Sequence, residues 1–274
     1  MNKITKAIKN PRKIIPFLKR EFLDAPKAKK VILKNQELKD IYKEKRCFII
    51  GNGPSIKDQD LTLFKNEITF VANNFYLHKD FDKIAPKYYT AIDPTFFREN
   101  EMNLKWFSNL QEKAKNCTLF FSWRARSIFQ KYNLFPNHRV YYLFSSGEFE
   151  ENGRFQTEID KQIPSLINVV LANLFIARYM GFKKIYLLGC DHDWLAQPSN
   201  LPLSHFYEYD KDPFYDETHR TYEEILTEIL ELFKSYRLIK ERFNDDNIKV
   251  YNATKGGFLD VFDRVKYEDI VGKI

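Results

Sequence analysis

Short apolar runs recur along this chain. They comprise residues 47–50, 68–72, 88–92, 118–121, 140–143, 184–191 and 248–251. Runs of this length are typical of strands that are buried on both faces, as in a parallel sheet. The first three runs are followed by Gly51, Asn73 and Asp93, so a turn or a polar side chain comes directly after each expected strand.

Two helical patterns accompany the later runs. Residues 166–180 are apolar nearly all round and end at Gly181, a common residue at the end of a helix. Residues 221–242 form an amphipathic pattern rich in Glu, Leu and Ile. Strands that alternate with helices predict an α/β fold with a Rossmann-like, mostly parallel sheet and helices on both faces. Ligands of such sheets bind at the carboxyl ends of the strands.

The sequence also predicts a domain organisation. Residues 1–46 are charged and helix-prone, and we interpret them as a basic helical N-terminal extension. Residues 47–274 are expected to form the Rossmann-like domain. Within it, residues 193–220 are polar, aromatic and without a regular period. A segment of this length without a pattern is uncommon inside a compact domain, so we expect a lid at about 193–220.

The composition is that of a globular protein. Of its 274 residues 44% are hydrophobic, which is enough for a packed core. Cys47, Cys117 and Cys190 are widely spaced, and we expect reduced core thiols. No stretch approaches the ~20 apolar residues that cross a bilayer. The N-terminus also lacks the pattern of a signal peptide. We therefore expect a cytoplasmic protein, and the sequence is compatible with an oligomer.

The first 20 residues hold seven basic side chains and no acidic one, with isoleucine, leucine and phenylalanine between them. Such a segment could lie on an anionic membrane surface, which would make the protein peripheral on the inner face of the plasma membrane. It could equally be a solvated tail or a helix packed on the body. No recognised nucleic-acid-binding module accompanies the charge, so we expect no nucleic-acid partner.

The turn after the first run is a candidate phosphate or ribose site. Its candidate residues are Gly51, Asn52, Gly53 and Ser55. Glycines let backbone amides approach a phosphate closely, and the Asn and Ser side chains can bond a ribose or phosphate oxygen. The spacing is neither the dinucleotide fingerprint nor a P-loop. The same turn could serve the backbone alone.

Two further run ends supply candidates. Asn73, followed by Asn74, offers an amide that both donates and accepts, which suits a nucleobase or a sugar hydroxyl. It could also cap a loop. Asp93 precedes Pro94 and could either bind a ligand or start a turn.

The run at 184–191 leads into Asp191-His192-Asp193, which admits a metal reading. On an extended strand Asp191 and Asp193 would share a face, and paired carboxylates hold Mg²⁺ on diphosphates in many transferases. The other reading is that Asp191 stabilises the following turn. We expect no metal, with Mg²⁺ through Asp191 and Asp193 as the alternative.

The expected lid carries two histidines, His205 and His219. A histidine is a suitable base for removing a proton from an acceptor hydroxyl. Arg220, beside His219, could pair with a carboxylate or phosphate of a donor.

Taken together, these motifs resemble the family 42 bacterial sialyltransferases. The resemblance rests on Gly-Asn-Gly-Pro-Ser at 51–55, Asn-x-Phe-Tyr at 73–76, Asp-Pro-Thr-Phe-Phe at 93–97, and the run from Gly181 to Asp191. A Ser-His-aromatic step at 204–206 follows in both. The likeness covers roughly residues 47–261. The same pattern resembles the Maf motility accessory factors and the hydroxymethylpterin diphosphokinase-like domain.

The resemblance to the sialyltransferases implies a function. It implies transfer of an acidic sugar (sialic acid, Kdo or a related ulosonate) from a CMP-activated donor to a surface glycan or glycolipid of the lipopolysaccharide or capsule type. The base would be His219, which precedes the long helix, whereas His205 matches an earlier Ser-His pair. Nucleotide or donor contacts would come from Asn52, Ser55, Asn73, Asp93, Asn168, Asp191 and Arg220. The lid tyrosines that help neutralise the leaving phosphate would be drawn from Tyr207, Tyr209 and Tyr215.

This sequence departs from the family pattern at two points. Asp93 replaces an asparagine, and Asn168 stands where the family has Thr-Ser-Gly against the carboxylate of the donor. Two other functions therefore stay open: an ATP- and Mg²⁺-dependent pyrophosphoryl transferase of the hydroxymethylpterin diphosphokinase-like type, and a non-catalytic nucleotide-binding module.

Overall fold

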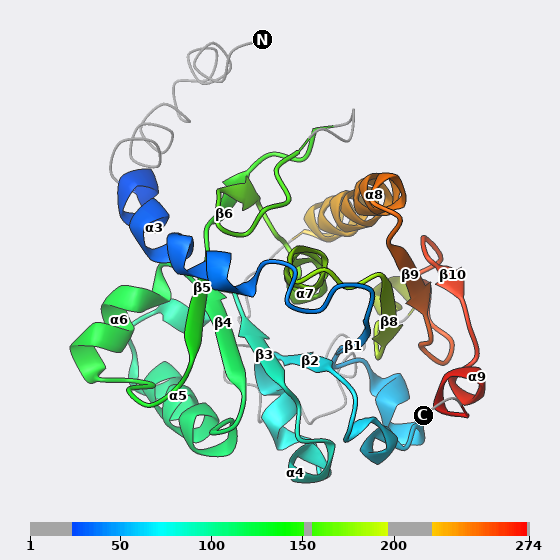
Figure 1. Ribbon diagram of the computed structural model, residues 1–274, viewed down its shortest axis with the longest axis horizontal. Coiled ribbons are helices and arrows are strands. Elements are labelled where there is room, and N and C mark those ends of the chain that lie inside the picture. The colour runs from blue at the N-terminus through cyan, green and yellow to red at the C-terminus, as the bar shows by residue number, and fades with distance from the viewer. Residues whose placement is uncertain (1–23, 151–154, 197–220, 273–274) are drawn as a thin grey trace.

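The computed structural model describes residues 24–150, 155–196 and 221–272. In these residues one parallel sheet has eight strands, in the order β10-β9-β8-β1-β2-β3-β4-β5 (Figure 1). The strands are β1 (Arg46–Ile50), β2 (Thr69–Ala72), β3 (Tyr88–Ala91), β4 (Thr118–Ser122), β5 (Val140–Leu143), β8 (Lys184–Leu188), β9 (Lys249–Asn252) and β10 (Asp263–Arg264). A short parallel pair, β6 (Ser145–Gly147) and β7 (Ile163–Pro164), stands apart from this sheet.

Helices cover both faces of the sheet. They are α3 (Ala25–Ile32), α4 (Phe81–Ile84), α5 (Glu101–Lys113), α6 (Ala125–Tyr132), α7 (Val169–Tyr179), α8 (Tyr222–Asp245) and α9 (Tyr267–Val271). Short 3₁₀ helices are η2 (Leu33–Leu38), η3 (Pro54–Asp58), η4 (Leu61–Phe64), η5 (Asn73–Leu77), η6 (Pro94–Phe97) and η7 (Trp194–Ala196). Buried side chains of α7 and α8 belong to one core, and those of α4, α5, α6 and α9 belong to the other. This confirms the predicted Rossmann-like α/β fold.

The strand order places a switch point beside β1. The chain runs outward from β1 through β2, β3 and β4 to β5, and then returns to place β8 on the other side of β1. Ile49 of β1 pairs with Phe70 of β2 and with Leu187 of β8. The carboxyl ends of β1, β2 and β8 therefore lie side by side, which is where open α/β sheets leave room for a ligand.

The helix α7 is the central helix of the upper layer (Figure 1). It contacts β1, β3 and α8, and most of its side chains are buried. A helix that packs on a sheet and on another helix has almost no exposed face, which explains why it is apolar nearly all round. It begins at Val169 rather than at residue 166 because Asn168 caps it.

The segment α3–η2 packs on the edge strand β5 (Figure 1). Ala28 and Ile32 are buried there, and the Nδ2 amide of Asn35 donates to the carbonyls of Tyr142 (2.8 Å) and Ile159 (2.7 Å). The folded body thus includes residues before 46, where the sequence suggested a division. The buried positions of this segment recur about every third residue, and its abundant lysines hide that spacing in the sequence.

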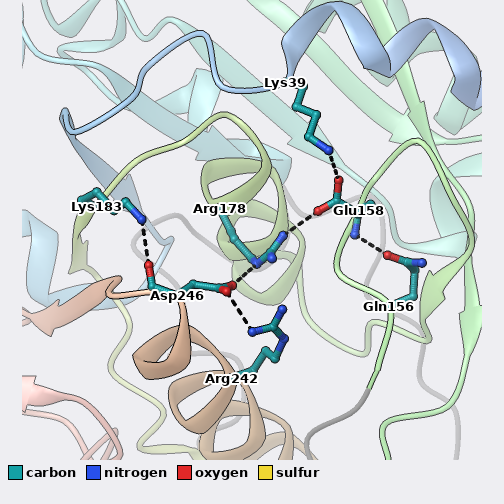
Figure 2. A network of polar contacts seen from close by, with 7 residues as sticks. All are labelled: Lys39, Gln156, Glu158, Arg178, Lys183, Arg242 and Asp246. Carbon is teal, nitrogen blue, oxygen red and sulfur yellow. Dashed lines mark hydrogen bonds and ion pairs between the residues drawn. The ribbon is translucent and has the colours of Figure 1, made fainter.

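A network of ion pairs joins several of these elements (Figure 2). Arg178 of α7 donates from Nη1 to Glu158 (3.0 Å) and from Nε to Asp246, just after α8 (2.8 Å). Lys39 binds Glu158 at 2.7 Å, and Arg242 of α8 binds Asp246 at 2.9 Å.

Among the helices in the described ranges, none combines the length and hydropathy needed to span a bilayer.

Candidate functional site

The backbones that follow β1 and β8 lie against each other. The Gly51 amide donates to the Leu188 carbonyl (2.7 Å), and the Gly53 amide donates to the Gly189 carbonyl (2.9 Å). A Cβ atom on Gly51 would lie 2.4 Å from the oxygen of Gly189. Gly189 itself has a φ of +61°, which favours glycine. The predicted glycine turn is therefore present, and these glycines allow two chain segments to approach closely.

Asp191 holds the turn after β1 in place. Its Oδ1 accepts from the Ser55 amide (3.1 Å) and its Oδ2 accepts from the Ser55 hydroxyl (2.9 Å). Burial raises the pKa of Asp191, and the two hydrogen bonds from Ser55 oppose that shift. A Cβ atom on Gly53 would lie 1.8 Å from Oδ2, so the carboxylate occupies the space that this glycine leaves. The structure thus brings together Gly53, Ser55 and Asp191.

His192 is anchored in the protein interior. It has a φ of +53°, so the chain after β8 is not an extended strand. Its Nε2 lies 2.9 Å from the hydroxyl of Tyr236 on α8. Burial lowers the pKa of His192 to about 4, against the opposing effect of a hydrogen bond to the backbone of Cys190. The ring is therefore neutral at physiological pH. Its hydrogen bond with Tyr236 connects the segment after β8 to α8.

The arrangement around Asp191 does not fit the Mg²⁺ site considered from the sequence. Mg²⁺ requires carboxylate oxygens that can complete a near-octahedral oxygen shell. Both oxygens of Asp191 already accept hydrogen bonds from Ser55. The described part of the chain also contains no group of three or more His, Cys, Asp or Glu side chains that could hold a metal ion.

Asn52 and Asn73 follow neighbouring strands and have unsatisfied side chains. The Nδ2 amide of Asn52 donates to the Ala72 carbonyl at 3.1 Å, which places this side chain against the end of β2. Within the described residues, the Oδ1 atoms of Asn52 and Asn73 are buried and lack a hydrogen-bond partner, although both residues remain partly exposed. A buried acceptor without a donor costs about 1–3 kcal/mol. A ligand that donates to these two oxygens would remove that cost.

Two further predicted site residues cap local elements. Oδ1 of Asp93 accepts from the amide (2.8 Å) and the hydroxyl (2.7 Å) of Thr95 at the start of η6. Oδ1 of Asn168 accepts from the amide of Val170 (2.7 Å) at the start of α7. These are the turn and capping roles that Asp and Asn commonly have. Their contact with a donor stays a prediction.

The remaining predicted site residues lie outside the described residues. They are His205, Tyr207, Tyr209, Tyr215, His219 and Arg220, together with most of the expected lid at 193–220.

The structure adds a third segment that the sequence analysis did not assign to the site, the turn after β9. The hydroxyl of Thr254 accepts from the Cys190 amide at 3.0 Å. The Phe258 amide donates to the Asp191 carbonyl at 2.7 Å. A Cβ atom on Gly257 would lie 2.3 Å from that carbonyl oxygen. The pair Gly256-Gly257, which follows the apolar run 248–251 after four residues, was the sequence signal for this contact.

A family model described as "6-hydroxymethylpterin diphosphokinase MptE-like" matches residues 24–197, more than half of the chain. A solved structure of the sialyltransferase CstII from Campylobacter jejuni, in complex with the substrate analogue CMP-3FNeuAc, is 20% identical in sequence. The match covers 81% of this chain and 85% of that chain, with a TM-score of 0.42. No curated protein sequence matches.

Proposed function

Because this chain belongs to the 6-hydroxymethylpterin diphosphokinase MptE-like family, we propose that it is a transferase that binds a nucleotide at the carboxyl ends of β1 and β2. The proposal is supported by the side-chain oxygens of Asn52 and Asn73 at the switch point, which are buried and have no hydrogen-bond partner in the part of the chain that the structure describes. Ribose hydroxyls and the amino group of a nucleobase are donors, so a nucleotide can satisfy both oxygens.

The donor that we propose is a CMP-activated acidic sugar, on the strength of the motif resemblance described above. An acceptor hydroxyl attacks the anomeric carbon and forms the new glycosidic bond. The bond from that carbon to the phosphate oxygen breaks, and CMP leaves with the electron pair. We assign His219, which precedes α8 in the chain, as the base that takes the proton of the hydroxyl. The acceptor would be a glycan or glycolipid of the cell surface, assembled at the inner face of the membrane.

A second candidate is pyrophosphoryl transfer from ATP, which the family description favours. It requires a divalent metal to neutralise the transferred phosphates. The Asp191 carboxylate, bonded to Ser55, does not fit that role in the described residues. The dependence of nucleotide binding on Mg²⁺ separates the two candidates.

The test is calorimetric titration with CMP and with ATP, each with Mg²⁺ and with EDTA. We expect CMP to bind equally well in EDTA. Asn73 has a φ of +54°, so Asn73→Gly removes the amide without backbone strain. Asn73→Gly and Asn52→Ala should each weaken CMP binding about tenfold, because each removes roughly one net hydrogen bond.

The matched control is Asn109→Ala, which removes an exposed asparagine on α5 and should bind CMP as the wild type does. Wild-type affinity in both site variants would contradict the proposed nucleotide site. Binding of ATP only with Mg²⁺, together with no binding of CMP, would instead favour the pyrophosphoryl transferase.

A further inference from the structure

The exposed side of the α3–η2 segment is strongly basic. Its buried side chains face β5 and recur every three or four residues, as Ala28, Ile32, Asn35 and Leu38. Lys27, Lys29, Lys30 and Lys34 occupy other positions of the segment and are exposed. Packing on the sheet edge therefore turns the lysines of this segment outward.

Cations from two other elements adjoin these lysines. Arg124, just before α6, lies 3.7 Å from Asp24, which precedes α3. The neighbouring Trp123 packs in the small core that α3 forms with Phe144. Lys34 reaches the carbonyl of Val140 at 3.3 Å. The exposed residues Lys27, Lys29, Lys30, Lys34, Arg124, Arg126 and Arg139 together form what we call the basic face.

Little acidic charge offsets the basic face. Two carboxylates offset part of the seven positive charges: Asp24 pairs with Arg124, and Glu37, which accepts a hydrogen bond from the Tyr141 hydroxyl, lies beside the lysines in the sequence. In the described part of the chain, no ion pair joins Lys27, Lys29 or Lys30 to an acidic side chain. The field of these cations is therefore directed to the solvent, where an anionic partner can meet it.

We propose that the basic face docks the protein on an anionic phospholipid bilayer. A Lys or Arg near such a surface strengthens binding about fivefold, or about 1 kcal/mol. The preceding residues 1–20 add seven basic side chains and no acidic one, so the charge continues along the chain. Leu33 is 43% exposed among the lysines, and apolar residues also separate the basic ones in residues 1–20. Apolar side chains between cations fit a lipid surface better than a nucleic acid backbone.

The test is flotation of the full chain with vesicles of phosphatidylcholine alone and of phosphatidylcholine with phosphatidylglycerol. We expect binding to the anionic vesicles alone, weakened by salt because the attraction is screened. The triple variant Lys27→Glu, Lys29→Glu and Lys30→Glu should bind at least about 100-fold more weakly, since three fivefold contributions are lost.

The matched control changes the same net charge elsewhere, through Lys65→Glu, Lys105→Glu and Lys115→Glu at exposed positions. It should keep most of the vesicle binding. An equal loss of vesicle binding in both triple variants would mean that only net charge matters, and would overturn the proposal. Undiminished vesicle binding by the first triple variant would overturn it as well. Binding of a DNA duplex that is lost in the first variant, without vesicle binding by the wild type, would make the face a nucleic-acid surface.

Affinity for CMP is measured on the same samples. The basic face contains none of the residues assigned to the nucleotide site, so both triple variants should bind CMP unchanged. The bilayer proposal and the proposed function can therefore fail separately.

Discussion

At the scale of single residues, several of the polar side chains around the switch point bind the protein itself. Asp191 holds Ser55, and His192 holds Tyr236 of α8. These bonds fix the backbone after β1 and β8, whereas the side-chain oxygens of Asn52 and Asn73 receive no hydrogen bond from the residues that the structure describes. The distinction between satisfied and unsatisfied atoms separates the residues that build the site from those that are free to meet a ligand.

His192 should make stability depend on pH. Its folded pKa, lowered by burial to about 4, lies below the ordinary value of about 6.5. The neutral ring therefore stabilises the fold fully above pH 6.5, and this contribution is lost as the pH falls toward 4. Replacement by Asn, which tolerates the positive φ, removes that dependence. The free-energy difference between wild type and His192→Asn should shrink by up to about 3 kcal/mol from pH 7 to pH 4.

Urea unfolding at a series of pH values measures this difference. A difference that stays constant over the range would mean that His192 takes up a proton in the folded state as readily as in the unfolded chain.

At the scale of elements, the ion-pair network connects α7 to α8 and to the segment that precedes β7 (Figure 2). Arg178 is central, because it bonds both Glu158 and Asp246. Its side chain is only 12% exposed, so its charge would be costly without these partners. The network lies near the end of α7, whereas Asn168, which caps its start, belongs to the carboxyl edge of the sheet.

Glu158→Gln should destabilise the protein by about 1–3 kcal/mol at pH 7, because it leaves Arg178 with one carboxylate. Burial alone would raise the pKa of Glu158, but hydrogen bonds from Lys39 and Arg178 bring it below its usual value. The carboxylate thus stabilises the fold above pH ~4.3, and this effect is lost as the pH falls through the lower folded pKa.

The loss of stability in Glu158→Gln is accordingly expected to fade in acid. Denaturation at pH 7 and below pH 4 checks this, with Glu112→Gln on the exposed side of α5 as the control. Equal stability of both variants at pH 7 would mean that the ion-pair network makes no net contribution to the free energy of unfolding.

At the scale of the whole molecule, one sheet separates two cores that share no helix among those described. Cys47 and Cys190 lie in one core, and Cys117 lies in the other. All three are free and buried. Burial raises the pKa of each thiol, that of Cys117 to about 12. A single sheet shared by both cores predicts that they unfold together.

The three thiols should therefore react with a disulfide reagent only when the whole protein unfolds. We expect native reaction rates at least about 1000-fold below that of an exposed thiol, because the reactive state is the rare unfolded one. Ser108→Cys on the exposed face of α5 supplies the reference thiol. Rapid reaction of Cys190 alone would instead reveal local opening at the end of β8.

Seven of the eight strands of the main sheet and the class of fold could be predicted from the sequence, whereas β6, β7 and β10, with only two or three residues each, could not. A continuous apolar run is typical of a strand buried on both faces, so residues 47–50 could be assigned as a buried strand before any contact was known, whereas residues 140–143 form an edge strand whose alternate residues are only partly buried. Two features differ from the prediction. The helix α7 starts at Val169 because Asn168 caps it, and residues 25–38 pack on the body instead of forming an extension. The cap is a local contact between Asn168 and the amide of Val170, whereas the packing of residues 25–38 depends on β5, which is distant in the chain.

The roles of the site residues were decided by the tertiary structure. The sequence placed Asp191, Asn52 and Asn73 at strand ends. Residue identity alone does not tell whether a carboxylate or an amide binds a ligand or the protein backbone. Only the packing of β8 against β1 brought Ser55 to Asp191. Among the described residues, the oxygens of Asn52 and Asn73, which follow β1 and β2, are buried without donors. Hydrogen bonds between segments more than 100 residues apart follow from the strand order, which the local sequence does not encode.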